Sequence, residues 1–196
     1  MSQRELYAKG GITRWYWDYR DRAVLRHTAR ETSILDIGCG EGVTLEKVRQ
    51  QEEGRMLCGV DRDPMNVLAC RKHDLAATVS NIYKLNNVTA GWNCVLLLDV
   101  IEHLEYPDYA LEQIHHKLGR DGKLILMFPN DRLFFWARMA FLKFRAAFAR
   151  SGHVKKWNLS GMIRTLRGAG FSILITERLP SFSPWPLHHL IVARKI

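Results

Sequence analysis

The chain has 196 residues, a length that fits one domain with a full hydrophobic core. Hydrophobic residues make up 47% and charged residues 25%, which excludes a disordered chain, and no apolar run approaches the roughly 18–20 residues that cross a bilayer. The net charge of +9 indicates an anionic partner, either nucleic acid or a membrane surface, without choosing between them.

The first residues, MSQRELYAKGG, lack the apolar core of a secretory signal, so we expect a cytoplasmic protein. The four cysteines follow no zinc-ligand spacing. We therefore expect reduced structural thiols and no metal site.

Strand-length apolar runs alternate with helical patterns through the first two thirds of the chain. The run at 93–99, NCVLLLD, is continuously apolar, as in a strand buried on both faces of a parallel sheet. The alternation predicts a parallel α/β sheet. The predicted strands are 33–37, 56–60, 76–80, 93–99 and 123–128, and the predicted helices are 43–48, one that begins at Pro64, and 109–118.

The last third of the chain does not continue this alternation of strand and helix patterns. Residues 132–150 and 159–166 have helical patterns, and 171–177 and 189–193 have strand patterns. Because no helix separates these two strands, we expect them to be antiparallel at an edge of the sheet.

A glycine turn follows the first predicted strand in the sequence LDIGCGEG, with Gly38, Gly40 and Gly42. In an open parallel sheet, ligands bind at the carboxyl ends of the strands. Asp61 ends the second strand, nineteen residues beyond Gly42, where a carboxylate can accept hydrogen bonds from ribose hydroxyls. Together they predict a site for a nucleoside cofactor, and the alternative is a tight turn without a ligand.

The glycine spacing argues against a dinucleotide. The pattern is G-x-G-x-G, with Val43 where the G-x-G-x-x-G fingerprint has its third glycine. Glu41 also stands at the turn, and an acid is a poor neighbour for a pyrophosphate. A cofactor with an ammonium group suits the turn better, which favours S-adenosylmethionine over NAD.

Four motifs resemble those of the class I S-adenosylmethionine-dependent methyltransferases, in the small-molecule group that includes the quinone-biosynthesis enzymes. They are ILDIGCGEG, GVDRDP, LLLDVIEHL and KLILMFPN, and the resemblance spans residues 33–196. It implies a Rossmann-like, doubly wound sheet of seven strands, mostly parallel with an antiparallel C-terminal edge hairpin. Two positions depart from the family pattern: LGRDG at 118–122 replaces L-x-P-G-G, and Asn81-Ile82 stands where an acid often faces the adenine.

The resemblance also implies roles for individual residues. The amino-acid end of the cofactor is assigned to Asp36 and the backbone of Gly38, Cys39 and Gly40. The ribose is assigned to Asp61, the adenine to Arg62, Asn81 and Ile82, and the pocket near the sulfonium to Asp99 and Val100. Within a single domain 1–196, it implies a helical cover (1–30), a cofactor-binding half (31–130), a basic amphipathic insertion (131–157) and a C-terminal helix and hairpin (158–196).

Methyl transfer needs alignment above all, and a general base only where the acceptor loses a proton. His103 follows the fourth strand and is the candidate base, although it could equally serve only to hydrogen-bond a loop. His153 lies where similar enzymes carry a histidine near the acceptor. We interpret the pairs His115-His116 and His188-His189 as solvated or structural. Tyr16 and Trp17 are candidates for a lid over the cofactor or for packing onto the sheet.

The segment 132–150 reads RLFFWARMAFLKFRAAFAR. As a helix, it would carry its basic residues on one arc, and its apolar residues would extend beyond the single face that packs on a core. It suits peripheral contact with a membrane, a cover over a lipid-like acceptor, or simple packing into the core, and it makes nucleic acid a less favoured partner. We therefore expect a small, apolar acceptor methylated on O, N or C, and a cytoplasmic protein with membrane association as an option. The rival functions are an NAD-dependent oxidoreductase and a non-catalytic binding protein of the same fold. The oligomeric state stays open.

Overall fold

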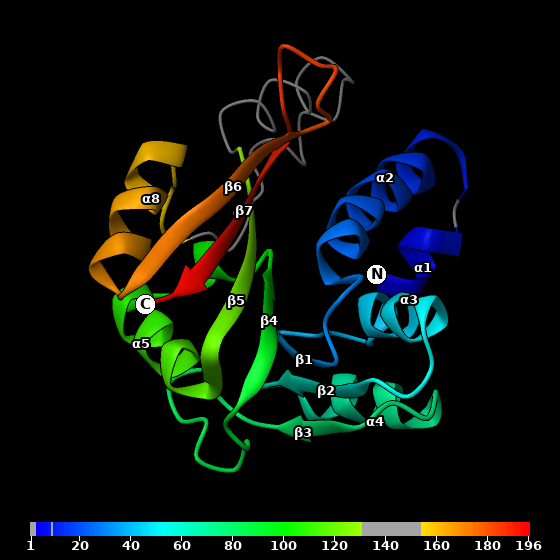
Figure 1. Ribbon diagram of the computed structural model, residues 1–196. Helices are drawn as coiled ribbons and strands as arrows, with labels where there is room; N and C mark the ends of the chain where they lie inside the picture. The colour runs from blue at the N-terminus through cyan, green and yellow to red at the C-terminus, as the bar shows by residue number, and fades with distance from the viewer. Residues whose placement is uncertain (1–2, 9, 131–153) are drawn as a thin grey trace.

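The computed structural model describes residues 3–8, 10–130 and 154–196. Seven strands form one twisted sheet in the order β3-β2-β1-β4-β5-β7-β6 (Figure 1). All pairs from β3 to β5 are parallel, and β7 is antiparallel to both of its neighbours. The strands are β1 Ser33–Ile37, β2 Met56–Asp61, β3 Ala77–Val79, β4 Trp92–Leu98, β5 Leu118–Pro129, β6 Phe171–Leu179 and β7 His188–Lys195. The predicted α/β fold with a mostly parallel, seven-stranded sheet is confirmed.

Only one of the two C-terminal strands lies at the edge of the sheet. β7 lies between β5 and β6, so β6 alone forms the edge. The apolar run of β7 at 190–193 fits this interior place, and the strand is buried from His188 to Ala193.

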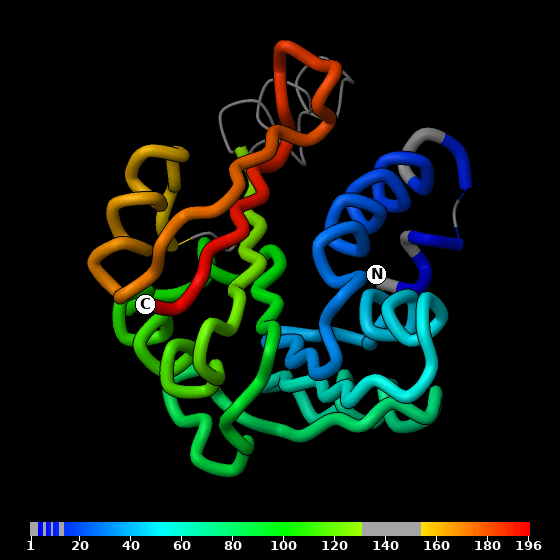
Figure 2. Tube along the Cα trace, viewed as in Figure 1, coloured from blue at the N-terminus to red at the C-terminus, as the bar shows by residue number. Residues whose placement is uncertain are grey.

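Helices cover both faces of the sheet, which makes it doubly wound (Figures 1 and 2). One face carries α5 and α8, and the other carries α2, α3 and α4. Two helices begin as their sequences predict: Pro64 opens α4 behind the Asp63 cap, and the Asn158 side chain caps α8. The helices are α1 Gln3–Ala8, α2 Gly11–Thr28, α3 Val43–Gln51, α4 Pro64–Lys72, the short 3₁₀ helix η1 Ile101–His103, α5 Pro107–Lys117 and α8 Leu159–Gly168.

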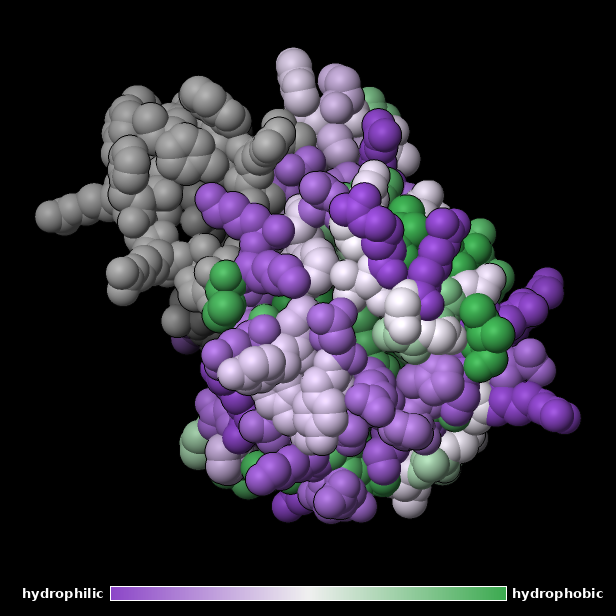
Figure 3. All heavy atoms as spheres, turned by 90° about the vertical axis from the view of Figure 1, so that its left-hand side faces the viewer, coloured by the Kyte–Doolittle hydropathy of each residue, from purple (hydrophilic) through white to green (hydrophobic). Residues whose placement is uncertain are grey.

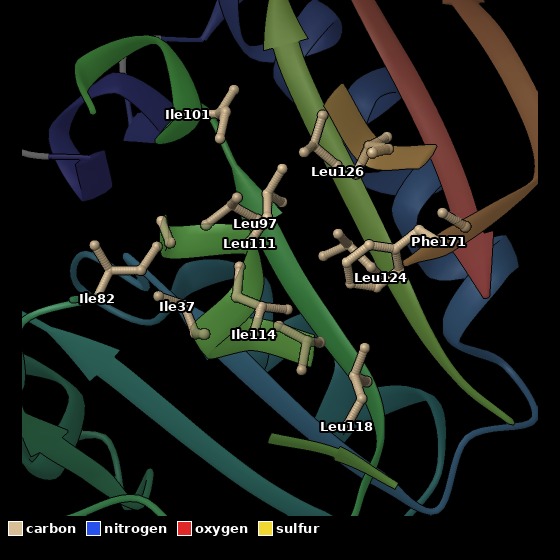
Figure 4. Close-up of a cluster of buried hydrophobic side chains, with 14 of the residues drawn as sticks. Ile37, Ile82, Leu97, Ile101, Leu111, Ile114, Leu118, Leu124, Leu126 and Phe171 are labelled. Atoms are coloured by element: carbon tan, nitrogen blue, oxygen red, sulfur yellow. The ribbon is translucent and has the colours of Figure 1, made fainter. Parts of the chain in front are cut away.

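The larger hydrophobic core lies between the sheet and the α5–α8 layer (Figure 4). Leu97, Leu124 and Leu126 from the central strands meet Leu111 and Ile114 from α5 there. The outer surface on this side of the molecule is mainly hydrophilic, with scattered apolar side chains (Figure 3). The helices on this side are therefore amphipathic, and their apolar sides hold the central strands in place.

The strand β5 begins at Leu118 and not at Lys123, as the sequence pattern predicted. Trp92 pairs with Leu118 and Cys94 pairs with Lys123, so the residues between Leu118 and Lys123 form a bulge inside the ladder. Asp121 takes a left-handed φ of 58° there. The turn-like sequence LGRDG is thus absorbed as an irregularity of the strand.

The predicted helix at 132–150 and the candidate His153 lie outside the described residues. Within the described part of the chain, no helix is long and apolar enough to cross a membrane.

Candidate functional site

The glycine turn after β1 is bound to the end of β2 through its own backbone. Gly38 N and Cys39 N both donate to Val60 O, at 2.7 and 3.1 Å, and Gly40 N donates to Asp61 Oδ2 at 2.9 Å. Gly38 has φ 78°, and a Cβ at this position would lie 2.4 Å from Val100 Cγ2. Only glycine therefore fits between β1 and the residue that follows β4.

Asp61 joins the glycine turn to the start of α4. Its side chain is buried, and its second oxygen, Oδ1, accepts a hydrogen bond from Asp63 N at 2.8 Å. Each carboxylate oxygen thus holds one backbone N–H and retains a lone pair for a further donor. This arrangement fixes a carboxylate at the carboxyl end of β2, beside the turn.

Asp36, on β1, is a buried acid in the same crevice, with only 2% of its surface exposed. Within the described residues, its carboxylate accepts no hydrogen bond. Burial raises the pKa of Asp36 to about 7, with Arg20 opposing the rise and Asp61 adding to it. A carboxyl group in this state gains most from a ligand that carries a positive charge.

Asp99 breaks the alternation of β4 to reach the opposite face of the sheet. Leu96 and Leu98 lie in the core on the α2 side, whereas Leu97 lies in the core below α5 and α8. Regular pleating would turn residue 99 towards α5 and α8. Asp99 instead takes a left-handed φ of 54°, and its carboxylate pairs with Arg20 of α2.

The Arg20–Asp99 pair is part of a buried polar chain. His188, at the start of β7, lies 3.3 Å from Asp99 through Nε2, and its Nδ1 is hydrogen-bonded to the Tyr16 hydroxyl. Burial would raise the pKa of Asp99, but Arg20 and His188 outweigh it and lower the pKa to about 2. The guanidinium carbon of Arg20 also lies 4.4 Å from the centre of the Trp17 ring. The helix α2 is thereby fastened across the carboxyl end of β4 and the amino end of β7.

These groups converge where the strand order reverses, between β1 and β4, which is the usual ligand crevice of an open α/β sheet. The family model described as "Methyltransferase domain" matches residues 9–175, most of the chain. The chain belongs to this methyltransferase family. The predicted resemblance to methyltransferases is confirmed.

Individual relatives of this chain are distant. It is 30% identical over 101 residues to the mitochondrial ubiquinone biosynthesis O-methyltransferase of Schizosaccharomyces pombe, a match covering 47% of this chain and 36% of that protein. The chain spans less than half the length of the curated relatives it matches first.

Solved structures share the fold at low sequence identity. A SAM-dependent methyltransferase from Archaeoglobus fulgidus has a TM-score of 0.72 and 18% identity, over 93% of this chain and 94% of that one. The magnesium protoporphyrin IX methyltransferase of Synechocystis, solved with bound SAH, has a TM-score of 0.71 and 16% identity, over 98% of this chain and 92% of that one.

The other residues predicted for the site differ in their surroundings. Arg62 is exposed, and Asn81 is exposed with its Oδ1 accepting from Tyr83 N at 3.0 Å. Ile82 is buried in the α5–α8 core (Figure 4). His103 ends η1 with 42% of its side chain exposed and Nε2 3.9 Å from Glu102 Oε1.

Sequence reasoning missed Arg20 and treated His188 only as solvated or structural. Both are buried and share the Asp99 carboxylate. A signal existed for Arg20, because it stands four residues after Tyr16 and four before Val24, on the helix face that meets the sheet. His188 carried no such signal, since only the insertion of β7 beside β5 brings it to this site.

Asp99→Asn tests the buried ion pair. Arg20 also lies 3.6 Å from Asp21, so removing one of its two carboxylate partners should lower the free energy of unfolding at neutral pH by about 2 kcal/mol. Arg20 and His188 hold the folded-state pKa of Asp99 at about 2, against about 4 for an unfolded chain. The stabilisation is therefore complete above about pH 4 and is lost as the pH falls towards 2.

Urea unfolding at neutral pH and at about pH 3 measures this, with a smaller difference between wild type and variant at the lower pH. Asp108→Asn, at an exposed site in α5, should change stability by less than about 0.5 kcal/mol at either pH. A difference for Asp99→Asn that did not vary with pH would contradict a role for the carboxylate charge.

Proposed function

We propose that this protein transfers a methyl group from S-adenosylmethionine to a small, apolar or lipid-like acceptor. Membership of the methyltransferase family supports the reaction. Solved neighbours described as SAM-dependent or SAH-bound support the cofactor. The acceptor class is argued below from His103 and from the reaction in a relative's name.

The observation that carries the cofactor assignment is the state of the glycine turn. Its N–H groups at Gly38, Cys39 and Gly40 already donate to Val60 and Asp61. A pyrophosphate needs such donors free. The turn therefore has few free N–H donors for an anion. Asp36 and Asp61 beside it favour a cationic ligand with hydroxyl donors. Both features argue against NAD.

The residues present fit S-adenosylmethionine, which supplies a methyl group on a sulfonium sulfur when bound. Asp36 would hold the ammonium group, and Asp61 would accept hydrogen bonds from the ribose hydroxyls. Arg20 is the buried cation of the same crevice and would balance the cofactor carboxylate. The residues of the chain would then bind the cofactor, orient it towards the acceptor and exclude water.

His103 is the candidate general base for an acceptor that must lose a proton. It ends η1, directly after the carboxyl end of β4, and its partly exposed ring is open to a substrate. The relative named for O-methylation in ubiquinone biosynthesis supports an acceptor oxygen. An apolar phenol or enol is thus the acceptor class that we favour.

Asp61→Asn tests the cofactor. The variant should bind S-adenosylhomocysteine about 10- to 100-fold more weakly, because a charge-assisted hydrogen bond is worth about 1.5–3 kcal/mol. Isothermal titration calorimetry measures the affinity. Asp63→Asn, two residues on, retains an α4 cap and should bind like wild type. Binding of NAD in place of S-adenosylhomocysteine would refute the assignment.

The raised pKa of Asp36 predicts that a proton is released when the cofactor binds. A cofactor ammonium beside Asp36 should lower its pKa from about 7, so affinity should rise as pH increases to about 7 and then level off. Near pH 6, binding should release about one proton. Calorimetry in buffers of different ionisation enthalpy counts that proton. The same count in Asp36→Asn would exclude Asp36 as its source.

Transfer of labelled methyl groups tests the acceptor. Label should enter alkyl-substituted phenols that partition into an organic phase. His103→Gln should lower kcat/KM for these phenols about a hundredfold while leaving transfer to a tertiary amine, which has no proton to lose, unchanged. Label found only in RNA would contradict the acceptor class. Binding of S-adenosylhomocysteine without any turnover would favour the non-catalytic alternative.

A further inference from the structure

The connection between β6 and β7, residues 180–187, is a folded loop with its own hydrogen bonds. Leu187 N donates to Leu179 O at 2.7 Å and closes the loop at its base. Ser183 Oγ donates to Trp185 O and accepts from Trp185 N, both at 3.1 Å. The loop extends from the ends of β6 and β7 (Figure 2), and these hydrogen bonds hold its backbone together.

The loop is also held against α2. The Tyr19 hydroxyl is 2.8 Å from Ser181 Oγ and accepts from Ser181 N at 3.1 Å. The Phe182 ring contacts Trp15 and Tyr19, with ring centres 6.0 and 5.9 Å apart, and Trp15 stacks on Tyr19 at 5.7 Å. We call these rings and that of Trp185 the aromatic surface.

The aromatic surface is ordered, and yet it faces solvent. Phe182 is 70% exposed, Trp185 is 69% exposed and Trp15 is 45% exposed. Scattered apolar residues are normal on a protein surface, but two exposed aromatic side chains on one hydrogen-bonded loop, with Phe182 packed against an exposed Trp15 of α2, are not explained by folding. The core is already filled without them.

The two acids nearest this surface, Asp18 and Glu177, are paired with Lys47 and with Arg26, so the charge left around the surface is positive. The sequence carries no Asp or Glu after Glu177, so no carboxylate lies in the loop or in β7. Arg178, just before the loop, is exposed, and Arg14, next to Trp15 in α2, has 60% of its side chain exposed and pairs only loosely with Asp18 at 3.5 Å. With a net charge of +9, the protein favours an anionic partner at this surface.

The surface lies at the end of the sheet that holds the site. The loop ends at Leu187, whose carbonyl accepts from Asn130 N at 2.7 Å beyond the carboxyl end of β5. The next residue, His188, is the partner of Asp99. Contact made through the loop would therefore bring the crevice close to the partner.

We propose that the aromatic surface docks onto the interface of an anionic lipid bilayer. Tryptophan and tyrosine join an apolar ring to a polar N–H or O–H, and they concentrate at the level of lipid headgroups. Phenylalanine adds apolar area, and nearby arginines are attracted to anionic headgroups. None of the residues of this surface belongs to the segment 132–150, and the inference does not depend on the proposed methyl transfer.

Vesicle co-sedimentation tests the proposal with the full chain. The probes are phosphatidylcholine vesicles with and without phosphatidylglycerol, at low salt. Wild type should pellet with the anionic vesicles, and the double variant Phe182→Ser/Trp185→Ser should partition about tenfold less or weaker still. The matched control is Met56→Ser, which removes an apolar side chain that is 56% exposed at the start of β2, at the opposite end of the sheet, and should bind like wild type.

Calorimetry with S-adenosylhomocysteine and circular dichroism check that the double variant is folded. Quenching of wild-type tryptophan fluorescence by brominated phosphatidylglycerol, reduced by Trp185→Ser alone, would support docking through this loop. Equal pelleting of wild type and double variant would overturn the proposal and leave membrane binding to other residues. Self-association that the double variant abolishes, with no vesicle binding, would overturn it in favour of a second copy of the chain.

Discussion

The buried ion pair between Arg20 and Asp99 is the contact on which the crevice depends. It joins α2 to the end of β4, although a chain separation of 79 residues lies between its partners. A buried pair adds little net stability over apolar packing, but losing one partner is costly because the other charge stays unpaired. Such a pair therefore specifies one position of α2 more than it strengthens the fold.

The position of α2 in turn sets the electrostatics of the site. Arg20 keeps Asp99 ionised and partly offsets the burial that raises the pKa of Asp36. The two aspartates thus differ sharply in acidity, although both lie at the carboxyl ends of adjacent parallel strands. Asp99 is ionised and paired within the protein, whereas the protonation of Asp36 can change when a ligand binds.

Most of the sheet could be predicted because its information is local. Apolar runs identify strands, and the spacing of Gly38, Gly40 and Asp61 predicts a glycine turn and a carboxylate at the same end of the sheet. The contact from Gly40 N to Asp61 Oδ2 shows why the two motifs belong together. The β5 bulge was missed because LGRDG is a turn sequence by every local criterion, and only pairing with β4 makes it part of a strand.

The polar chain around Asp99 could not be predicted, because its members come from three distant parts of the sequence. Tyr16 and His188 are 172 residues apart, and no periodic pattern records such a distance. The reversed alternation at Asp99 is a second reason, since strict pleating would have placed its carboxylate on the other face. Asp61, which follows local rules, was assigned from the sequence, whereas the partners of Asp99 were not.

The interior place of β7 has a consequence for how the chain is made. β7 is synthesised after both of its neighbours, yet it separates them in the sheet. Until it arrives, β5 and β6 each present an unpaired edge to other chains. The first five strands can assemble early through short connections, but the sheet closes only after β7 has been synthesised. During translation the protein is therefore most prone to aggregate just before β7 emerges.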